Sequence, residues 1–109
     1  MGQYTEPSSP VEKAVALLPT LLSQRGIERN HFTTTEIWAL TIRTTPTHGE
    51  LVEMGYALKR AGYEKYGGGN GIVIRIDQSN RGSRYWRILN THIHSAPSRV
   101  RADVKANKL

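Results

Sequence analysis

Three copies of one short pattern determine where helices can begin in this chain. A hydroxyl residue is followed three positions later by glutamate at Ser9–Glu12, Thr33–Glu36 and Thr47–Glu50. In such a capping box the hydroxyl accepts a hydrogen bond from the backbone N–H of the third helical residue, and the glutamate accepts one from the capping residue. Each box therefore predicts a helix that begins at the residue after the hydroxyl.

The first box precedes a segment with one apolar face. Pro10 takes the first helical position, where a missing N–H costs nothing, and apolar residues recur at helical spacing from Val11 to Leu22. Pro19 lies inside this pattern and is expected to bend or split the helix. Gly26 is the predicted end. The sequence therefore predicts a helix that packs on a core through one face.

The second and third boxes predict two further helices joined by a turn. A very short strand, residues 31–32, precedes the second helix, which is short and ends near Thr41. A turn through Pro46 follows, since proline disfavours helix at the residue before it. The third helix ends at Gly62. Its predicted apolar face consists of Leu51, Met54, Leu58 and Ala61.

Beyond Tyr63 the apolar pattern changes to a period of two, which indicates strands. Residues 72–77 and 85–88 alternate in this way around the turn-rich segment 78–83, and they predict an antiparallel hairpin. The glycine run 67–71 precedes the first strand without the lysine, hydroxyl residue and helix that a nucleotide-binding loop requires. We therefore expect these glycines to turn the chain through positive φ angles.

At 109 residues the chain can form one domain around a small core. The pattern divides it into a flexible leader (1–9), a domain (10–94) and a basic, flexible tail (95–109). Cysteine is absent, which excludes disulfides and thiolate metal sites. No apolar run is long enough to span a bilayer, and the first residues lack the order of a signal peptide. We expect a cytoplasmic protein.

Positive charge is concentrated in the second half of the chain, and the formal net charge of the whole chain is +6. Residues 1–55 carry four basic and six acidic side chains, whereas residues 56–109 carry eleven basic and three acidic ones. A basic half on a small domain is typical of a protein that binds a polyanion. A basic surface that serves only solubility is the alternative interpretation.

The order helix, short strand, helix, turn, helix, strand, wing, strand is that of a winged helix-turn-helix. This is an α+β fold with three helices, a short strand and a two- to three-stranded antiparallel wing. FTTTEIW (32–38), ALKRAGYEKY (57–66) and RIDQSNRGSRYWRI (75–88) resemble the C-terminal winged-helix module of phage, plasmid and virulence-associated primase-helicases. The resemblance covers roughly residues 10–90. It implies a DNA-binding module, appended or free-standing, in replication or regulation of a phage or mobile element.

The resemblance also implies which side chains meet DNA, since the third helix of a winged helix often enters the major groove while the wing reaches the backbone. The reading positions would be Thr47, His48, Gly49, Val52, Glu53, Tyr56, Lys59 and Arg60. The backbone contacts would come from Lys65, Arg75, Asn80, Arg81, Arg84 and Arg87. Arginine suits phosphate because its planar fork pairs with phosphate oxygens. Glu50 and Glu53 repel phosphates, so nonspecific or wing-dominated binding is expected over strong base readout.

The aromatic residues divide into two groups. Trp38 and Trp86 lie in apolar periodic patterns and are expected in the core. Tyr56 and Tyr85 fall on faces predicted to be exposed and basic, where a tyrosine can stack on single-stranded DNA.

Two other functions fit parts of the sequence. A protein-interaction module, an adaptor or inhibitor, would use the same basic surface on an acidic partner. A metal-dependent nicking enzyme would use His92 and His94, but no carboxylate cluster completes the ligand set. We therefore expect a binding protein with no catalytic residue, cofactor or metal.

Overall fold

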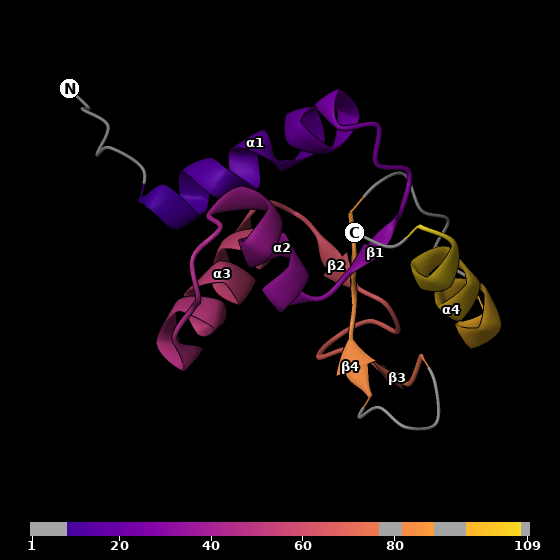
Figure 1. Cartoon of the computed structure of the whole chain (residues 1–109). Coiled ribbons are helices and arrows are strands. Elements are labelled where there is room, and N and C mark those ends of the chain that lie inside the picture. Colours follow the sequence, from indigo (N-terminus) through magenta and orange to yellow (C-terminus); the bar gives the residue numbers. More distant parts are fainter. Residues whose placement is uncertain (1–8, 77–81, 89–95, 108–109) are drawn as a thin grey trace.

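The computed structural model describes residues 9–76, 82–88 and 96–107. Within these ranges the chain is an α+β fold of four helices and two small antiparallel sheets (Figure 1). The elements in chain order are α1 (Pro10–Gln24), β1 (His31–Phe32), α2 (Thr34–Thr41), α3 (His48–Arg60), β2 (Glu64–Lys65), β3 (Val73–Ile74), β4 (Ser83–Arg84), β5 (Trp86–Arg87) and α4 (Pro97–Ala106).

The three predicted helix starts are confirmed. At α2 the Thr33 hydroxyl accepts from the Glu36 N–H at 3.1 Å, and the Glu36 carboxylate accepts from the Thr33 N–H at 2.8 Å. The Thr47 box of α3 has the same two bonds at 3.1 and 2.8 Å. At α1 the Ser9 hydroxyl accepts from the Glu12 N–H at 3.2 Å and contacts the Glu12 carboxylate at 3.5 Å.

The predicted glycine ends of the first and third helices are also confirmed. Gly26 and Gly62 have φ angles of +65° and +96°, a region that glycine enters without steric cost. The N–H of Ile27 donates back to the Leu22 carbonyl at 2.9 Å, which completes a Schellman motif, and α3 ends in the same way. Because α1 runs unbroken through the exposed Pro19, the predicted split of this helix does not occur.

Helices α1, α2 and α3 pack around the main core together with β1 and β5. Its most deeply buried members are Leu18, Leu22, Phe32, Ile37, Met54 and Leu58. Trp38 and Trp86 are both buried in this core, as predicted. Each indole N–H has an acceptor, the Thr44 carbonyl for Trp38 and the Thr34 hydroxyl for Trp86, both at 2.9 Å. Both tryptophan rings are therefore fixed in position.

The strands form two sheets instead of one continuous hairpin. β5 is the central strand of the first sheet, whose order is β1-β5-β2, and β3 pairs with β4 in the second. The second strand of the predicted hairpin is thus divided at Tyr85, between β4 and β5. The Tyr85 side chain is buried, only 5% exposed, and its carbonyl accepts from the Tyr66 N–H at 2.8 Å. The prediction that Tyr85 is exposed is therefore wrong.

The C-terminal segment is a helix, where the sequence analysis predicted a flexible tail. Val100 and Val104 lie four residues apart on α4 and are buried in a second core cluster. The other buried members of this cluster are Tyr66, Ile74 and Tyr85. Figure 1 shows α4 beside β1, on the opposite side of the strands from α2 and α3. Residues 97–106 therefore pack on the strands through α4.

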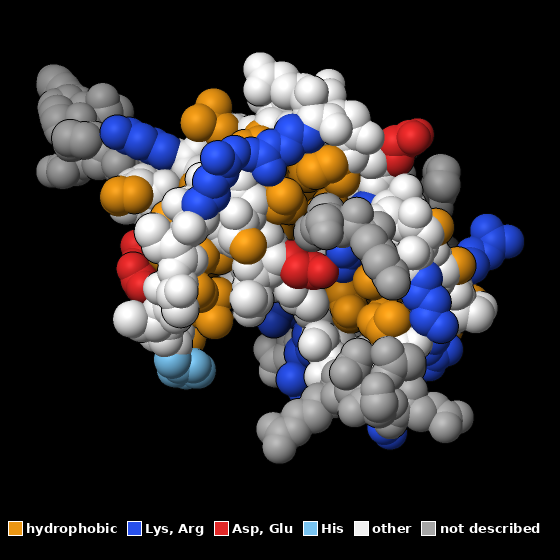
Figure 2. Space-filling view, in the orientation of Figure 1, with side chains coloured by type: hydrophobic (Ala, Val, Ile, Leu, Met, Phe, Trp, Pro, Cys, Tyr) orange, Lys and Arg blue, Asp and Glu red, His pale blue; other side chains and the backbone are white. Residues whose placement is uncertain are grey.

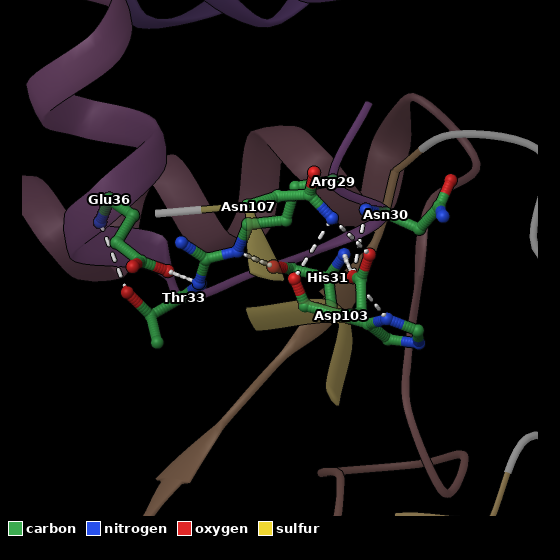
Figure 3. A network of polar contacts seen from close by, with 7 residues as sticks. All are labelled: Arg29, Asn30, His31, Thr33, Glu36, Asp103 and Asn107. Carbon is green, nitrogen blue, oxygen red and sulfur yellow. Dashed lines mark hydrogen bonds and ion pairs between the residues drawn. The ribbon is translucent and has the colours of Figure 1, made fainter. Parts of the chain in front are cut away.

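A polar cluster attaches α4 to β1 (Figure 3). One carboxylate oxygen of Asp103 accepts from the Asn30 N–H at 2.9 Å and from the His31 N–H at 3.0 Å, and lies 2.9 Å from His31 Nδ1. The buried Arg29 donates to the His31 carbonyl at 2.7 Å and to the Glu36 carboxylate at 2.6 Å. These bonds satisfy backbone groups beside β1 that would otherwise be buried without a partner.

Candidate functional site

A groove of about 690 Å³ lies between α3 and the glycine turn, residues 67–71. The α3 side is lined by His48, Leu51, Val52, Gly55, Tyr56 and Lys59. The opposite side is lined by Lys65, Gly68, Gly69 and Asn70, and Trp86 is also part of the lining. Figure 2 shows a hollow in the surface between α3 and the strands, with basic side chains along its inner edge. The volume is in the range of pockets that hold small molecules or parts of larger ligands.

Two cations, Lys59 and Lys65, line this groove, and Arg84 lies next to Lys65. Lys65 and Arg84 flank Gly71 closely, since a Cβ placed on that glycine would lie 3.2 Å from the Lys65 Cβ and 3.4 Å from the Arg84 Cβ. Burial lowers the pKa of Lys65, and the neighbouring positive charges of Arg84 and Lys59 lower it further. The ion pairs of the described residues involve none of these three cations. We refer to Lys59, Lys65 and Arg84 as the basic cluster.

Lys65 is held in place by the core beneath it. It lies opposite Trp86 in the register between β2 and β5, and its ammonium group is 5.0 Å from the centroid of the Trp86 ring. A cation at this distance over an indole face is attracted by the ring quadrupole. Because the Thr34 hydroxyl fixes the indole, the charge of Lys65 has a defined position at the groove.

The glycine turn gives the groove a wall with few side chains. Gly67, Gly68, Gly69 and Gly71 have φ angles of +91°, +76°, +51° and +88°, which confirms the prediction of positive-φ turns. A Cβ at Gly68 or Gly69 would meet nothing within 4 Å, so this wall is open. The N–H groups of Gly69 and Asn70 have no acceptor among the described residues. The backbone of the turn can therefore be approached closely and offers hydrogen-bond donors.

A pair of glycine substitutions tests this description of the turn. Gly67→Ala should lower the free energy of unfolding by about 1–3 kcal/mol, because alanine at φ +91° is strained and its Cβ would overlap Ile72. Gly55→Ala is the matched control inside α3, where a Cβ meets only Trp86 Cζ2 at 4.0 Å. It should raise stability by about 0.5–1 kcal/mol. Urea unfolding measures both, and equal effects would contradict the assigned backbone.

The structure brings five of the predicted site residues to the groove lining and places a sixth beside it. The five in the lining are His48, Val52, Tyr56, Lys59 and Lys65, and Arg84 lies next to Lys65. The side chain of Tyr56 is 61% exposed.

Two residues predicted on the reading face of α3 have other contacts. The Thr47 hydroxyl caps α3 by accepting from the Glu50 N–H at 3.1 Å. Arg60 extends toward α1, where its guanidinium lies 3.7 Å from the Glu12 carboxylate. Neither residue lines the groove. Fewer residues of α3 therefore face the groove than the helical pattern predicted.

The predicted phosphate-contacting arginines also differ in position. The Arg87 side chain is only 8% exposed and pairs with Glu64 at 2.8 Å, so the expectation that it projects outward is wrong. The cause is that β5 is the central strand of its sheet and not an outer strand. Arg75 is exposed near α4, where its carbonyl accepts from the Arg101 side chain at 2.8 Å. Asn80 and Arg81 lie outside the described residues.

Sequence reasoning missed two parts of this region. It did not place the glycine turn at the site, although the run of glycines lies directly after Lys65. It also did not find that α4 packs behind β3, because only two valines mark the apolar side of that helix. The groove and the basic cluster combine positive charge with an exposed tyrosine, so this region can hold an anion beside an apolar surface.

The described part of the chain holds no group of three or more histidine, cysteine or acidic side chains that could bind a metal ion, and His92 and His94 lie outside this part. No helix within the described ranges has the length and apolar character that crossing a membrane requires. Comparison with protein-family models, with curated proteins and with solved structures found no match for this chain.

Proposed function

We propose that the chain is a winged-helix DNA-binding protein that holds DNA at the groove between α3 and the glycine turn. The observation that carries this proposal is the basic cluster of Lys59, Lys65 and Arg84. Burial lowers the pKa of Lys65, and repulsion by the positive charges of Arg84 and Lys59 lowers it further. The described residues supply no ion pair to any of these three cations. A phosphate backbone relieves this repulsion and is the polyanion that such clusters most commonly bind.

The topology supports the winged-helix part of the proposal. α2 and α3 pack against each other and are joined by a short turn, as in a helix-turn-helix. The sheet order β1-β5-β2 pairs the first strand with the strand that follows the hairpin, and β3 and β4 correspond to the wing. α3 is then the helix presented to DNA, and β2 carries Lys65 beside it.

The acidic residues of α3, Glu50 and Glu53, lie outside the groove lining. The Glu50 carboxylate accepts the Thr47 N–H at 2.8 Å and serves the helix cap. Glu53 is exposed on α3 but is not part of the groove lining. Glu64 lines the groove, and its charge is offset by Arg87. The positive charge of Lys59, Lys65 and Arg84 therefore dominates the groove.

From the resemblance to primase-helicase modules we propose further that this binding serves replication or regulation of a phage or mobile element, in the cytoplasm. The proposed role is binding, without a catalytic step, cofactor or metal.

A second candidate is a small adaptor or inhibitor that docks on an acidic protein. The observation in its favour is a set of exposed apolar side chains, Val52, Tyr56, Ile72 and Val73. Such a partner would cover apolar surface and neutralise the same cations.

Titration of labelled DNA with the protein at low salt, followed by fluorescence anisotropy, tests the proposal. Duplex and single-stranded oligonucleotides are titrated in parallel. We expect saturable binding of at least one form that weakens as salt is added, since phosphate contacts release counterions. No anisotropy change with either form would reject DNA binding and favour the acidic protein partner.

A further inference from the structure

The groove combines two kinds of surface that a nucleotide also combines. Val52, Tyr56 and Trp86 supply apolar and aromatic lining, and Lys59 and Lys65 supply positive charge in the same groove. A nucleotide has a flat, largely apolar base attached to a charged phosphate. In a duplex the base faces are stacked on one another, and only their edges reach a protein. An unpaired base presents its whole face.

Among the described phenylalanine, tyrosine and tryptophan side chains, Tyr56 alone is exposed. Tyr66, Tyr85 and both tryptophans are buried, and Tyr63 is half-buried. Val52 lies four residues before Tyr56, so the two side chains share one face of α3 and form a continuous apolar strip along the groove. Exposed aromatic rings that stand next to cations are the usual platforms on which single-stranded nucleic acids stack.

Charge and backbone donors surround this platform. Lys59 lies three residues after Tyr56, which places its ammonium group on the same side of α3. Lys65 is fixed over the Trp86 ring on the other wall, and Arg84 stands beside it. The Gly69 and Asn70 N–H groups add donors on a wall without bulky side chains. A base on Tyr56 would therefore have its phosphate within reach of cations from both walls.

We infer that the groove is a site for single-stranded DNA, in which an unpaired base stacks on Tyr56 while its phosphates meet Lys59, Lys65 and Arg84. The inference rests on the proposed function and specifies the form of DNA that is bound. The apolar lining of the groove favours single-stranded over duplex DNA. A duplex backbone would bring charged phosphates against Val52 and Tyr56, whereas an unpaired base covers these two side chains.

An oligonucleotide that lacks bases separates this inference from the proposed function. A labelled deoxythymidine oligomer, an oligomer of equal length with abasic sugars, and a duplex are titrated with the full chain. We expect the intact single strand to bind at least about tenfold more tightly than the abasic strand and the duplex. Equal affinity for intact and abasic strands, or tighter binding of the duplex, would overturn the inference but leave DNA binding in place. If none of the three oligonucleotides binds, the proposed function is overturned as well.

Substitution of Tyr56 tests the stacking platform itself. Tyr56→Ala should weaken binding of the intact strand about 5- to 150-fold and leave binding of the abasic strand unchanged. Tyr56→Phe keeps the ring and should bind like the wild type. Leu17→Ala is the matched control, because Leu17 is equally exposed, at 60%, but lies on α1 outside the groove. An unchanged affinity for Tyr56→Ala would exclude the stacking role.

Discussion

Replacing Lys65 and Arg84 together by glutamate should lower the affinity of the protein for DNA by about 100-fold or more. The reversal puts two negative charges beside Gly71, at the groove where the phosphates are proposed to lie. Arg84 is exposed and Lys65 half-buried at the surface, so the fold should persist. Anisotropy at low salt measures the loss, and circular dichroism checks that the variant is folded.

A matched control variant distinguishes the effect of charge at the groove from the effect of the protein's net charge. Lys13→Glu with Arg25→Glu changes the net charge by the same amount at two exposed positions on or next to α1, away from the groove. This variant should keep most of the affinity, since it alters only long-range attraction that salt screens. If both double variants lose affinity equally, binding follows net charge, and the assignment of the groove is wrong.

Asp103→Ala should lower the free energy of unfolding by about 3–5 kcal/mol, because two backbone N–H groups and the His31 ring lose the acceptor that they share. The Asp103 side chain is only 13% exposed and accepts from two backbone N–H groups while facing the His31 ring. Its removal leaves the N–H of the buried His31 without an acceptor and releases α4 from β1. Urea unfolding measures the change.

Two further variants define the cause of that loss. Asp103→Asn keeps an oxygen acceptor but no charge, so its destabilisation should be smaller than that of the alanine variant. Glu53→Ala removes an exposed carboxylate for which the described residues provide no ion pair, and it should change stability by less than about 0.5 kcal/mol. If Asp103→Ala is as mild as Glu53→Ala, the Asp103–His31 contact does not hold α4.

The parts of the fold that depend on neighbours in sequence were predictable. The boxes at Thr33 and Thr47 place both partners three residues apart, so the sequence alone determines their bonds. Gly26 and Gly62 likewise end their helices through bonds to residues of the preceding turn. The apolar spacing of α1 and α3 then identified most of the residues that these two helices bury. The apolar patterns around Trp38 on α2 and Trp86 on β5 placed both tryptophans in the core.

The parts that depend on distant residues were not predictable in this way. Asp103 meets His31 across 72 positions of sequence, and no local pattern marks that pair. α4 was missed because Val100 and Val104 are its only buried residues among charged neighbours. Alternation placed Tyr85 outside, but the rule fails where the chain passes from β4 in one sheet to β5 in the other.

The candidate site, like the fold, was predictable where it depends on local spacing and not where it depends on strand pairing. Helical spacing correctly placed Tyr56 and Lys59 on the exposed face of α3. Arg75 and Arg87 were both predicted to contact phosphates, whereas β5 lies between two strands and Arg87 pairs with Glu64 across the sheet. This difference depends on which strands pair with one another, and no local pattern in the sequence shows that pairing.

The salt dependence of DNA binding tests directly whether this groove binds a phosphate backbone. If Lys59, Lys65 and Arg84 each meet one phosphate, the logarithm of the association constant should fall linearly with the logarithm of salt concentration. The expected slope is about −2 for single-stranded DNA and about −3 for duplex. We expect a slope at least this steep for the wild type. A slope near zero, or no binding of either form at low salt, would contradict phosphate binding at this groove.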